Sequence, residues 1–357
     1  MKYDLSYNFN VKTATPCCAI IPPYIFQHIA LFGSDRQRRF AFLNLNGSSE
    51  LRGERKAFLN LSAGFAIAPG ARKRSIYDAR NGMVLPGKLV RSEGASPVKD
   101  VSVNEAYAGT GRVFDFFSKA FGRNSIDDKG MQMDSTVHYR RKFSNAFWNG
   151  QQMVFGDGDG EIFQRFTGPL DIIAHELTHG VTQFEAGLQY VGDSGALNEH
   201  LSDVFGALAK QYRMKQKASN ADWVIGAGLL TEKINGVGIR SMKNPGTAYD
   251  DPVIGKDMQP AHMDNYVRTT EDNGGVHINS GIPNKAFYNL AVSLGGHAWI
   301  QAGKIWYTAL VERVRSDTGF QGFAQITFEV AGALYGAKSK EQKAVTKAWA
   351  EVGIGIE

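Results

Sequence analysis

The chain has 357 residues, of which 43% are hydrophobic and 21% charged, with a formal net charge of +5. This composition is typical of a globular protein of two domains with a sizeable core. No apolar run reaches the length of a membrane span, which excludes a spanning helix. The short basic clusters form no stripe of the kind that binds nucleic acid. We therefore expect neither a membrane nor a nucleic acid as partner.

The first 70 residues differ in character from the rest of the chain. An apolar, helix-like run at 25–32 is followed by a stretch rich in Gly, Ser and Arg at 47–54. The N-terminus lacks the apolar segment of a secretory signal, so we expect synthesis in the cytoplasm, with export by another route left open. The two cysteines, Cys17 and Cys18, are neighbours, and neighbours rarely pair, so we expect a fold without disulfides.

Two further regions follow, 71–169 and 170–357. In the first, β-type runs and Gly turns alternate with a helical stretch at 103–121, which is typical of a mixed domain with an antiparallel sheet. In the second, apolar residues recur at helical spacing. We expect an α+β fold with a β-rich N-terminal domain and a mainly helical C-terminal domain. Its helices are predicted at 170–185, 195–212, 283–295, 301–314, 320–335 and 341–352.

The most informative motif of the helical region is His175-Glu176-Leu177-Thr178-His179, which has the form H-E-x-x-H. On a helix, positions i and i+4 lie on one face, so the two imidazoles can bind one metal ion. Glu176 lies one step round the helix and can face a water molecule on that metal. The motif therefore indicates a zinc hydrolase with His175 and His179 as ligands.

A second helical stretch offers a third ligand. Glu199 and Asp203 lie four residues apart in an apolar, helix-like run, where charged side chains need a reason to be present. Glu199 would complete a set of two histidines and one glutamate, and Asp203 would accept the second ring N–H of a ligand histidine. A solvated helical face is the alternative for both residues. His200 points elsewhere on such a helix, and we interpret it as structural.

Several motifs, in their order along the chain, resemble one known family. This family is that of the thermolysin-like zinc metallopeptidases. Within it, the chain most resembles the protealysin-like branch, whose members have a short pro-segment. The match runs from about Ile76 to Ile354, and ordered matches of this number argue against an unrelated zinc hydrolase. The resemblance implies a two-domain fold with the zinc helix at the cleft, one catalytic zinc ion, and endopeptidase activity on proteins or peptides. The motifs are Ile76-Tyr77-Asp78-Ala79, Asn145-Ala146-Phe147-Trp148, Gly156-Asp157-Gly158-Asp159-Gly160, the H-E-x-x-H motif, Asn198-Glu199 with Asp203, and Asp272-Asn273-Gly274-Gly275-Val276-His277-Ile278-Asn279-Ser280-Gly281.

The resemblance also implies the catalytic roles. Glu176 would take a proton from the zinc-bound water and pass it to the leaving amine. His277, with Tyr190 beside it, would donate to the oxyanion, and Asp272 would orient His277. Taken alone, His277 in its Gly-rich turn is explained equally well by a structural role.

Substrate binding is implied in the same way. Asn145 and Ala146 would bind an extended peptide by strand addition. Arg240 would contact the carbonyl next to the cleavage point, with a surface salt bridge as the alternative. The pocket for the residue after the scissile bond is expected to be apolar and narrowed by Phe166, with cleavage before Leu, Ile, Val or Phe. The residues of this pocket are Phe163, Phe166, Ile172, Ile239 and Arg240.

The chain departs from the family at a paired calcium site. Two carboxylates remain at the matching positions, but a lysine and two apolar residues stand where further oxygen ligands are needed, so we expect this site to be lost. The carboxylates are Asp171 and Asp222, and the other three residues are Lys210, Val224 and Ala227. Asp157 and Asp159 leave two interpretations open, a calcium loop or a tight turn that uses Gly and Asp for its own backbone.

The resemblance makes the first 70 residues a pro-segment with its linker. We expect it to cover the cleft, to inhibit its own chain and to be removed by a cut within 47–74. In one possible mode, Cys17 or Cys18 binds the zinc as a thiolate. In the other mode of inhibition, part of the cleft is filled by Pro22-Pro23-Tyr24.

We expect the protein to be a monomer and an active enzyme. The alternative to an active enzyme is an inactive relative that is kept as a scaffold.

Overall fold

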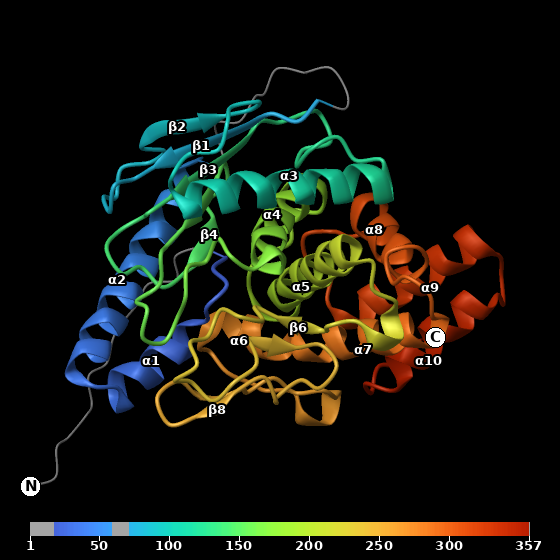
Figure 1. Ribbon diagram of the computed structural model, residues 1–357. Helices are drawn as coiled ribbons and strands as arrows, with labels where there is room; N and C mark the ends of the chain where they lie inside the picture. Colours follow the sequence, from blue (N-terminus) through green and yellow to red (C-terminus); the bar gives the residue numbers. More distant parts are fainter. Residues whose placement is uncertain (1–17, 59–70, 357) are drawn as a thin grey trace, which may run out of the picture.

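The structure is a computed structural model that describes residues 18–58 and 71–356, with the backbone alone for 47–58. Cys17 and most of the linker between the N-terminal segment and the rest of the chain lie outside the described residues. The described residues form a mixed sheet, a larger helical part and an N-terminal pair of helices (Figure 1). The expected α+β fold with a β-rich part followed by a helical part is confirmed.

The sheet has five strands in the order β2-β1-β3-β5-β4. β1/β2 and β4/β5 are antiparallel, whereas β1/β3 and β3/β5 are parallel. The prediction of an antiparallel sheet is therefore wrong for the two inner pairs. Parallel neighbours need a long crossover connection. Between β1 and β3 it contains β2 and the helix that follows, and between β3 and β5 it is the stretch 138–152, which contains β4. The strands are β1 (Arg74–Asp78), β2 (Lys88–Ser92), β3 (Met133–Val137), β4 (Ala146–Trp148) and β5 (Met153–Phe155).

The crossover helix is α3 (Val101–Phe121), close to its predicted position. The carboxylate of Asp100 accepts a hydrogen bond from the backbone N–H of Val103 at 3.2 Å and so caps the first turn. Gly122 ends the helix with a φ of +76°, a conformation that glycine adopts at little cost. The helix packs on β1 and β3 with one side and on the helical part with the other. It therefore joins the two parts into one core.

Helices dominate from Leu170 onward. Six of them lie close to their predicted positions. The sequence does not predict the seventh, α6, because its Asn273-Gly274-Gly275 stretch is typical of a turn, and these three residues do have positive φ. The helices are α4 (Leu170–Glu185), α5 (Gly192–Met214), α6 (Asp272–Asn279), α7 (Gly281–Leu294), α8 (Ala302–Glu312), α9 (Phe320–Tyr335) and α10 (Lys340–Ala350). Short elements complete this part: η1 (Ala218–Asn220), β6 (Val224–Ile225), β7 (Arg240–Ser241), β8 (Asp250–Asp251), β9 (Gly255–Lys256) and η2 (Met263–Asn265). In the described parts of the chain, no helix is both long and apolar enough to cross a membrane.

The helix that carries the H-E-x-x-H motif lies at the centre of the molecule. α4 packs against α5 along its length and also contacts α3 and β4, so it has neighbours on both the sheet side and the helical side (Figure 1). Every residue from Asp171 to Thr182 is buried. Because a helix with no solvated face is uncommon in a globular protein, the polar residues among these must be held by other polar groups.

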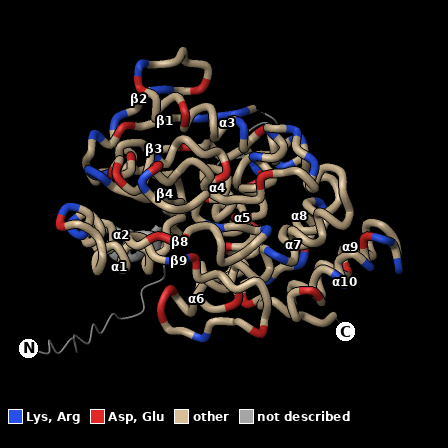
Figure 2. The backbone as a smooth tube through the Cα atoms, turned by 60° about the horizontal axis from the view of Figure 1, so that its bottom comes forward, with Lys and Arg blue, Asp and Glu red and all other residues tan. Residues whose placement is uncertain are grey.

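The N-terminal segment forms two packed helices, α1 (Pro23–Phe32) and α2 (Asp35–Phe58), beside the catalytic part. α1 lies next to β9, and the pair stands out from one side of the molecule (Figure 2). The Gly/Ser/Arg-rich stretch 47–54, interpreted as part of a linker, instead continues α2. Each glycine costs about 1 kcal/mol relative to alanine in a helix, but the Leu, Arg, Glu and Lys residues around them favour it.

Candidate active site

Three side chains from α4 and α5 place ligand atoms around one point. Nε2 of His175 lies 3.1 Å from Nε2 of His179, and each of these atoms lies 3.4 Å from a carboxylate oxygen of Glu199. Tetrahedral ligands about 2.0–2.1 Å from a zinc ion lie about 3.3 Å from one another. All three side chains are fully buried. Their spacing therefore fits a zinc ion, as the sequence predicts.

The other ring nitrogen of each histidine is held by a second residue. Nδ1 of His175 donates to Asp203 at 2.9 Å, and Nδ1 of His179 donates to the side-chain oxygen of Asn198 at 2.8 Å. These bonds leave the Nε2 lone pairs free to bind a metal. The role of Asn198 was not predicted, although it is part of the motif that contains Glu199.

Glu176 stands apart from this ligand set. Its Oε2 accepts a hydrogen bond from the backbone N–H of Trp148 in β4 at 3.0 Å. Its Oε1 is buried and has no hydrogen-bond partner among the described residues. Ligand atoms of Glu176, His175 and His179 lie within 4.8 Å of one another. Burial raises the pKa of Glu176 to about 8, so this carboxyl group can both accept and release a proton near neutral pH.

His277 reaches the site from α6. Its Nδ1 lies 2.7 Å from Asp272, and its Nε2 lies 3.2 Å from the hydroxyl of Tyr190 and 3.5 Å from Glu199. The Tyr190 hydroxyl also donates to Glu199. Burial opposes a charge on His277, but Asp272 and Glu199 outweigh it and raise its pKa. Its Nε2 faces Tyr190 and Glu199, so this is the ring atom that can donate into the site.

The glycine-rich turn before His277 is required by its backbone shape. Gly275 has a φ of +76°, and a Cβ there would come within 3.0 Å of the Asn279 amide and 3.2 Å of Thr269. The turn brings both Asp272 and His277 to the same side, and Asp272 also accepts from the backbone N–H of His277 at 2.8 Å. The glycines of the 272–281 motif are therefore explained by the backbone shape of the turn, and His277 is explained separately by its place in the site.

Arg240, in β7, is buried and not part of a surface salt bridge. It donates to both carboxylate oxygens of Asp203, from Nε and Nη2, at 2.8 Å each. Burial disfavours the charged form of Asp203, but Arg240 and His175 outweigh it and hold the pKa of Asp203 well below its usual range. The other residues of the predicted pocket are also buried. Ile172 and Ile239 meet across Gly226, and Phe163 lies beside Phe166 with ring centroids 6.0 Å apart.

Residues 18–21 of the N-terminal segment lie along the predicted substrate-binding residues. The backbone N–H of Ile20 donates to the carbonyl of Ala146 at 3.2 Å. The side chain of Asn145 pairs with both the N–H and the carbonyl of Ile21, at 3.0 and 3.2 Å. Asn145 and Ala146 thus bind an extended chain as expected, but that chain is the protein's own.

The remaining pro-segment predictions have mixed outcomes. Pro23 and Tyr24 line a hollow of about 230 Å³ next to Asp272, and Pro22 is buried behind them. Cys18 is buried against Tyr190 and Val276. Among the described residues, Cys18 does not join the side chains around His175 and His179 that have the spacing of metal ligands. Cys17 lies outside the described residues.

The helices of the segment are anchored on both parts of the molecule. On the sheet side, the ring of Phe26 lies 6.2 Å from that of Phe163, and the side chain of Asn44 accepts from the backbone N–H of Ser144 at 2.8 Å. On the helical side, Nδ1 of His28 lies 2.9 Å from the carbonyl of Val253. The segment therefore spans the cleft.

At the positions that match the paired calcium site, the ammonium group of Lys210 lies where a metal ion would otherwise bind. It donates to Asp171 at 2.8 Å and to Asp222 at 2.9 Å, and also to the carbonyl of Val224. At the Gly-Asp-Gly-Asp-Gly turn, the contacts support the tight-turn interpretation. Asp159 accepts three backbone N–H groups of the turn, and Asp157 binds His138 at 2.8 Å.

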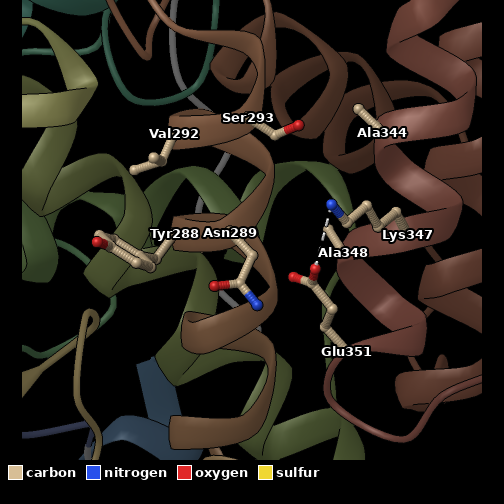
Figure 3. A pocket seen from close by; sticks show the side chains of 8 residues that line it. All are labelled: Tyr288, Asn289, Val292, Ser293, Ala344, Lys347, Ala348 and Glu351. Atoms are coloured by element: carbon tan, nitrogen blue, oxygen red, sulfur yellow. Dashed lines mark ion pairs between the residues drawn. The ribbon is translucent and has the colours of Figure 1, made fainter.

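Two other features lie away from the ligands. His200 hydrogen-bonds Asn284 and Trp306, each at 2.8 Å, which agrees with a structural role. A surface hollow of about 280 Å³ lies between α7 and α10, where Lys347 and Glu351 form an ion pair at 3.7 Å (Figure 3). Its lining offers no group of metal ligands, and it is separate from the cleft that holds residues 18–24.

Comparisons with known proteins show the family of the chain. Two family models match the chain: "Thermolysin metallopeptidase, catalytic domain" at residues 53–183 and "Thermolysin metallopeptidase, alpha-helical domain" at residues 186–354. The chain is 49% identical to an extracellular metalloprotease of Pectobacterium carotovorum subsp. carotovorum, over 96% of this chain and 97% of that protein. It is 41% identical to a thermolysin of Alicyclobacillus acidocaldarius subsp. acidocaldarius, over 78% of this chain and 50% of that protein. Among solved structures, a precursor of protealysin, a metalloproteinase from Serratia proteamaculans, is similar with a TM-score of 0.87 and 50% identity, and the match covers 95% of this chain and 100% of that one.

Proposed function

Because this chain belongs to the thermolysin metallopeptidases, which are zinc-dependent endopeptidases, we propose that it cuts peptide bonds before hydrophobic residues with Glu176 as general base. The observation that carries this proposal is the buried ligand set of His175, His179 and Glu199, with an unpartnered oxygen of Glu176 beside it. When bound, zinc lowers the pKa of a water molecule and polarises the scissile carbonyl.

The protein's own residues move the proton. Among the described residues Oε1 of Glu176 has no hydrogen-bond partner, so it takes a proton from the attacking water, while Oε2 stays fixed on the backbone of Trp148. The same carboxyl group then gives this proton to the leaving amine. His277 and Tyr190 donate to the carbonyl oxygen as it gains negative charge.

The substrate chain is held by strand addition. β4 is an edge strand of the sheet, so the backbone groups on its outer side become available to a substrate strand once residues 18–21 leave them. The Arg240 guanidinium, fixed by Asp203, supplies a donor to a substrate carbonyl. The buried side chains of Ile172, Ile239, Phe163 and Phe166 favour an apolar residue after the scissile bond.

We further propose that the chain with its first 70 residues is a latent precursor. Its support is that residues 18–21 occupy the backbone groups that a substrate would use. One experiment tests both proposals. The protein freed of its pro-segment and the Glu176→Ala variant should each bind one zinc ion, but only the former should cut casein, and the uncut precursor should be at least tenfold slower. If the freed protein binds zinc and cuts nothing, the scaffold interpretation holds instead.

A further inference from the structure

The N-terminal segment enters the cleft as an added strand. Ala19 pairs with Phe147 of β4 in an antiparallel bridge. The next residue, Ile20, donates its N–H to the carbonyl of Ala146. Residues 18–21 are all buried, so this strand is covered by protein on its outer side as well.

Every carbonyl and N–H from the Ala19 carbonyl to the Ile21 carbonyl has a partner in the active site. The Ala19 carbonyl lies 3.1 Å from Nε2 of His277. The Ile20 carbonyl accepts from Nη1 of Arg240 at 3.1 Å, and both backbone groups of Ile21 pair with Asn145. The contacts form a single register, and a shift by one residue would break all of them.

This register places one particular peptide bond beside the metal ligands. His277, which contacts the Ala19 carbonyl, also lies 3.5 Å from the ligand Glu199 and 3.2 Å from Tyr190. The other end of the same peptide bond, the N–H of Ile20, is fixed by Ala146. The Ala19 carbonyl therefore stands where the oxyanion donors converge, and the apolar, fully buried Ile20 follows it.

On the basis of the proposed function, we propose that residues 18–21 are bound as a substrate and that the zinc-loaded precursor hydrolyses its own Ala19–Ile20 peptide bond. The oxygen of a water molecule bonds to the carbonyl carbon of Ala19, and the carbon–nitrogen bond to Ile20 breaks. The proton taken from the water goes to the amine of Ile20. The products are a carboxylate at Ala19 and a new N-terminus at Ile20, and nothing is oxidised or reduced.

The cut would not by itself open the cleft. The new N-terminal residues Ile20 and Ile21 keep their bonds to Ala146, Arg240 and Asn145. They are also tied to α1, whose buried residues anchor it on the catalytic part. Full activity then needs the second cut, within 47–74. The first cut is therefore visible as a change in mass before activity appears.

The test follows the mass of the zinc-loaded precursor over time. The expected result is a fragment of residues 1–19 and a protein that begins at Ile20, formed with a first-order rate constant that is independent of protein concentration. The Ile20→Asp variant should form this fragment at least tenfold more slowly, because a charge would have to be buried. The Gln27→Ala variant, changed at an exposed position of α1, should match the unaltered rate.

A second readout does not depend on activity. The backbone amide hydrogens at positions 20 and 21 are compared in two zinc-loaded precursors, Glu176→Gln alone and Glu176→Gln with Ile20→Asp. They should exchange at least tenfold more slowly in the first protein than in the second. Equal exchange in the two proteins would contradict the register.

A peptide of residues 15–24, with both cysteines changed to serine, separates this proposal from the proposed function. The freed protein should cut it between Ala19 and Ile20, and it should also cut an unrelated peptide before a leucine. If the unrelated peptide is cut but neither the peptide nor the precursor is cut at this bond, the inference fails and the proposed function stands. If neither peptide is cut, both fail. An apparent first-order rate constant that rises in proportion to protein concentration would also overturn hydrolysis within one chain.

Discussion

Arg240 and Asp203 form a buried, two-point ion pair, with both hydrogen bonds at 2.8 Å. The same carboxylate accepts from Nδ1 of the ligand His175, and the same guanidinium donates to the carbonyl of Ile20. This pair therefore connects metal binding to the binding of a peptide chain. Both partners are almost fully buried, so neither charge can turn to water if the other is lost.

Removing one side of this pair should destabilise the protein strongly. We expect Arg240→Ala to lower the free energy of unfolding by about 3–5 kcal/mol, because Asp203 is left as a buried charge. Arg313→Ala is the matched control, since it breaks an exposed pair with Glu329 and should cost about 1 kcal/mol or less. Urea unfolding of the zinc-loaded precursors measures both. Similar losses in the two variants would contradict a special role for the buried pair.

Tyr190 should matter for turnover and not for metal binding. Its hydroxyl lies beside His277 and donates to Glu199. A hydroxyl has a single hydrogen, so Tyr190 donates to the developing oxyanion when its O–H turns away from Glu199. Tyr190→Phe removes that donor, so kcat of the freed protein should fall about 100–1000-fold with little change in KM. Zinc content, measured by atomic emission, should stay at one ion per chain. A large rise in KM with unchanged kcat would instead place Tyr190 in ground-state binding.

Calcium should not stabilise this protein at its former paired site. Lys210 already neutralises Asp171 and Asp222, so millimolar calcium should leave Tm unchanged. Lys210→Glu should lower Tm without calcium and recover it with calcium, because three carboxylates and the Val224 carbonyl then offer oxygen ligands. The control Lys347→Glu puts a like charge beside Glu351 on the surface and should not respond to calcium. A rise in the Tm of the unaltered protein would show that calcium binds elsewhere.

The stability of the protein should fall at alkaline pH because of His138, which follows β3. Hydrogen bonds from its ring to the carboxylates of Asp157 and Asp100 outweigh burial and raise the pKa of His138 from 6.5 to about 9. A pKa raised by folding gives stability that is fully present below pH 6.5 and lost as the pH rises through about 9. The stability difference between the unaltered protein and His138→Asn should therefore shrink from pH 6 to pH 10. Asparagine is chosen because His138 has a φ of +55°, which asparagine tolerates. A difference that is constant over this range would refute the linkage.

The sequence was informative where spacing determines geometry. Two histidines four residues apart, and a glutamate four residues before an aspartate, lie on defined faces of a helix, so the arrangement of His175, His179, Glu199 and Asp203 could be predicted. Asn198 was missed because an asparagine next to a ligand gives no signal of its own. Its bond to His179 depends on how α4 and α5 pack.

Tertiary pairing accounts for the predictions that failed. The β1/β3 pair depends on the path of α3 over the sheet, and the β3/β5 pair depends on the return of the chain through β4. Local alternation contains neither path. The Gly-rich stretch 47–54 continues α2 because helix-forming neighbours outweigh two glycines. The register of residues 18–21 on β4 could not be predicted either. The adjacent prolines suggested that Pro22-Pro23-Tyr24 fills part of the cleft, and Pro23 and Tyr24 do line a hollow beside Asp272. The contacts of the Ala19 and Ile20 backbone with His277 and Ala146 had no signal in the sequence.

The most direct test of the zinc site is a titration of the freed, chelator-treated protein with zinc, followed by hydrolysis of a peptide that contains one Ala–Ile bond. The ligand set His175, His179 and Glu199 predicts no activity without metal, a linear rise on adding zinc, and a break at one zinc ion per chain. The His179→Ala variant should show no rise over the same range. Hydrolysis that persists in the metal-free protein, or a His179→Ala variant that responds to zinc like the unaltered protein, would contradict the assignment.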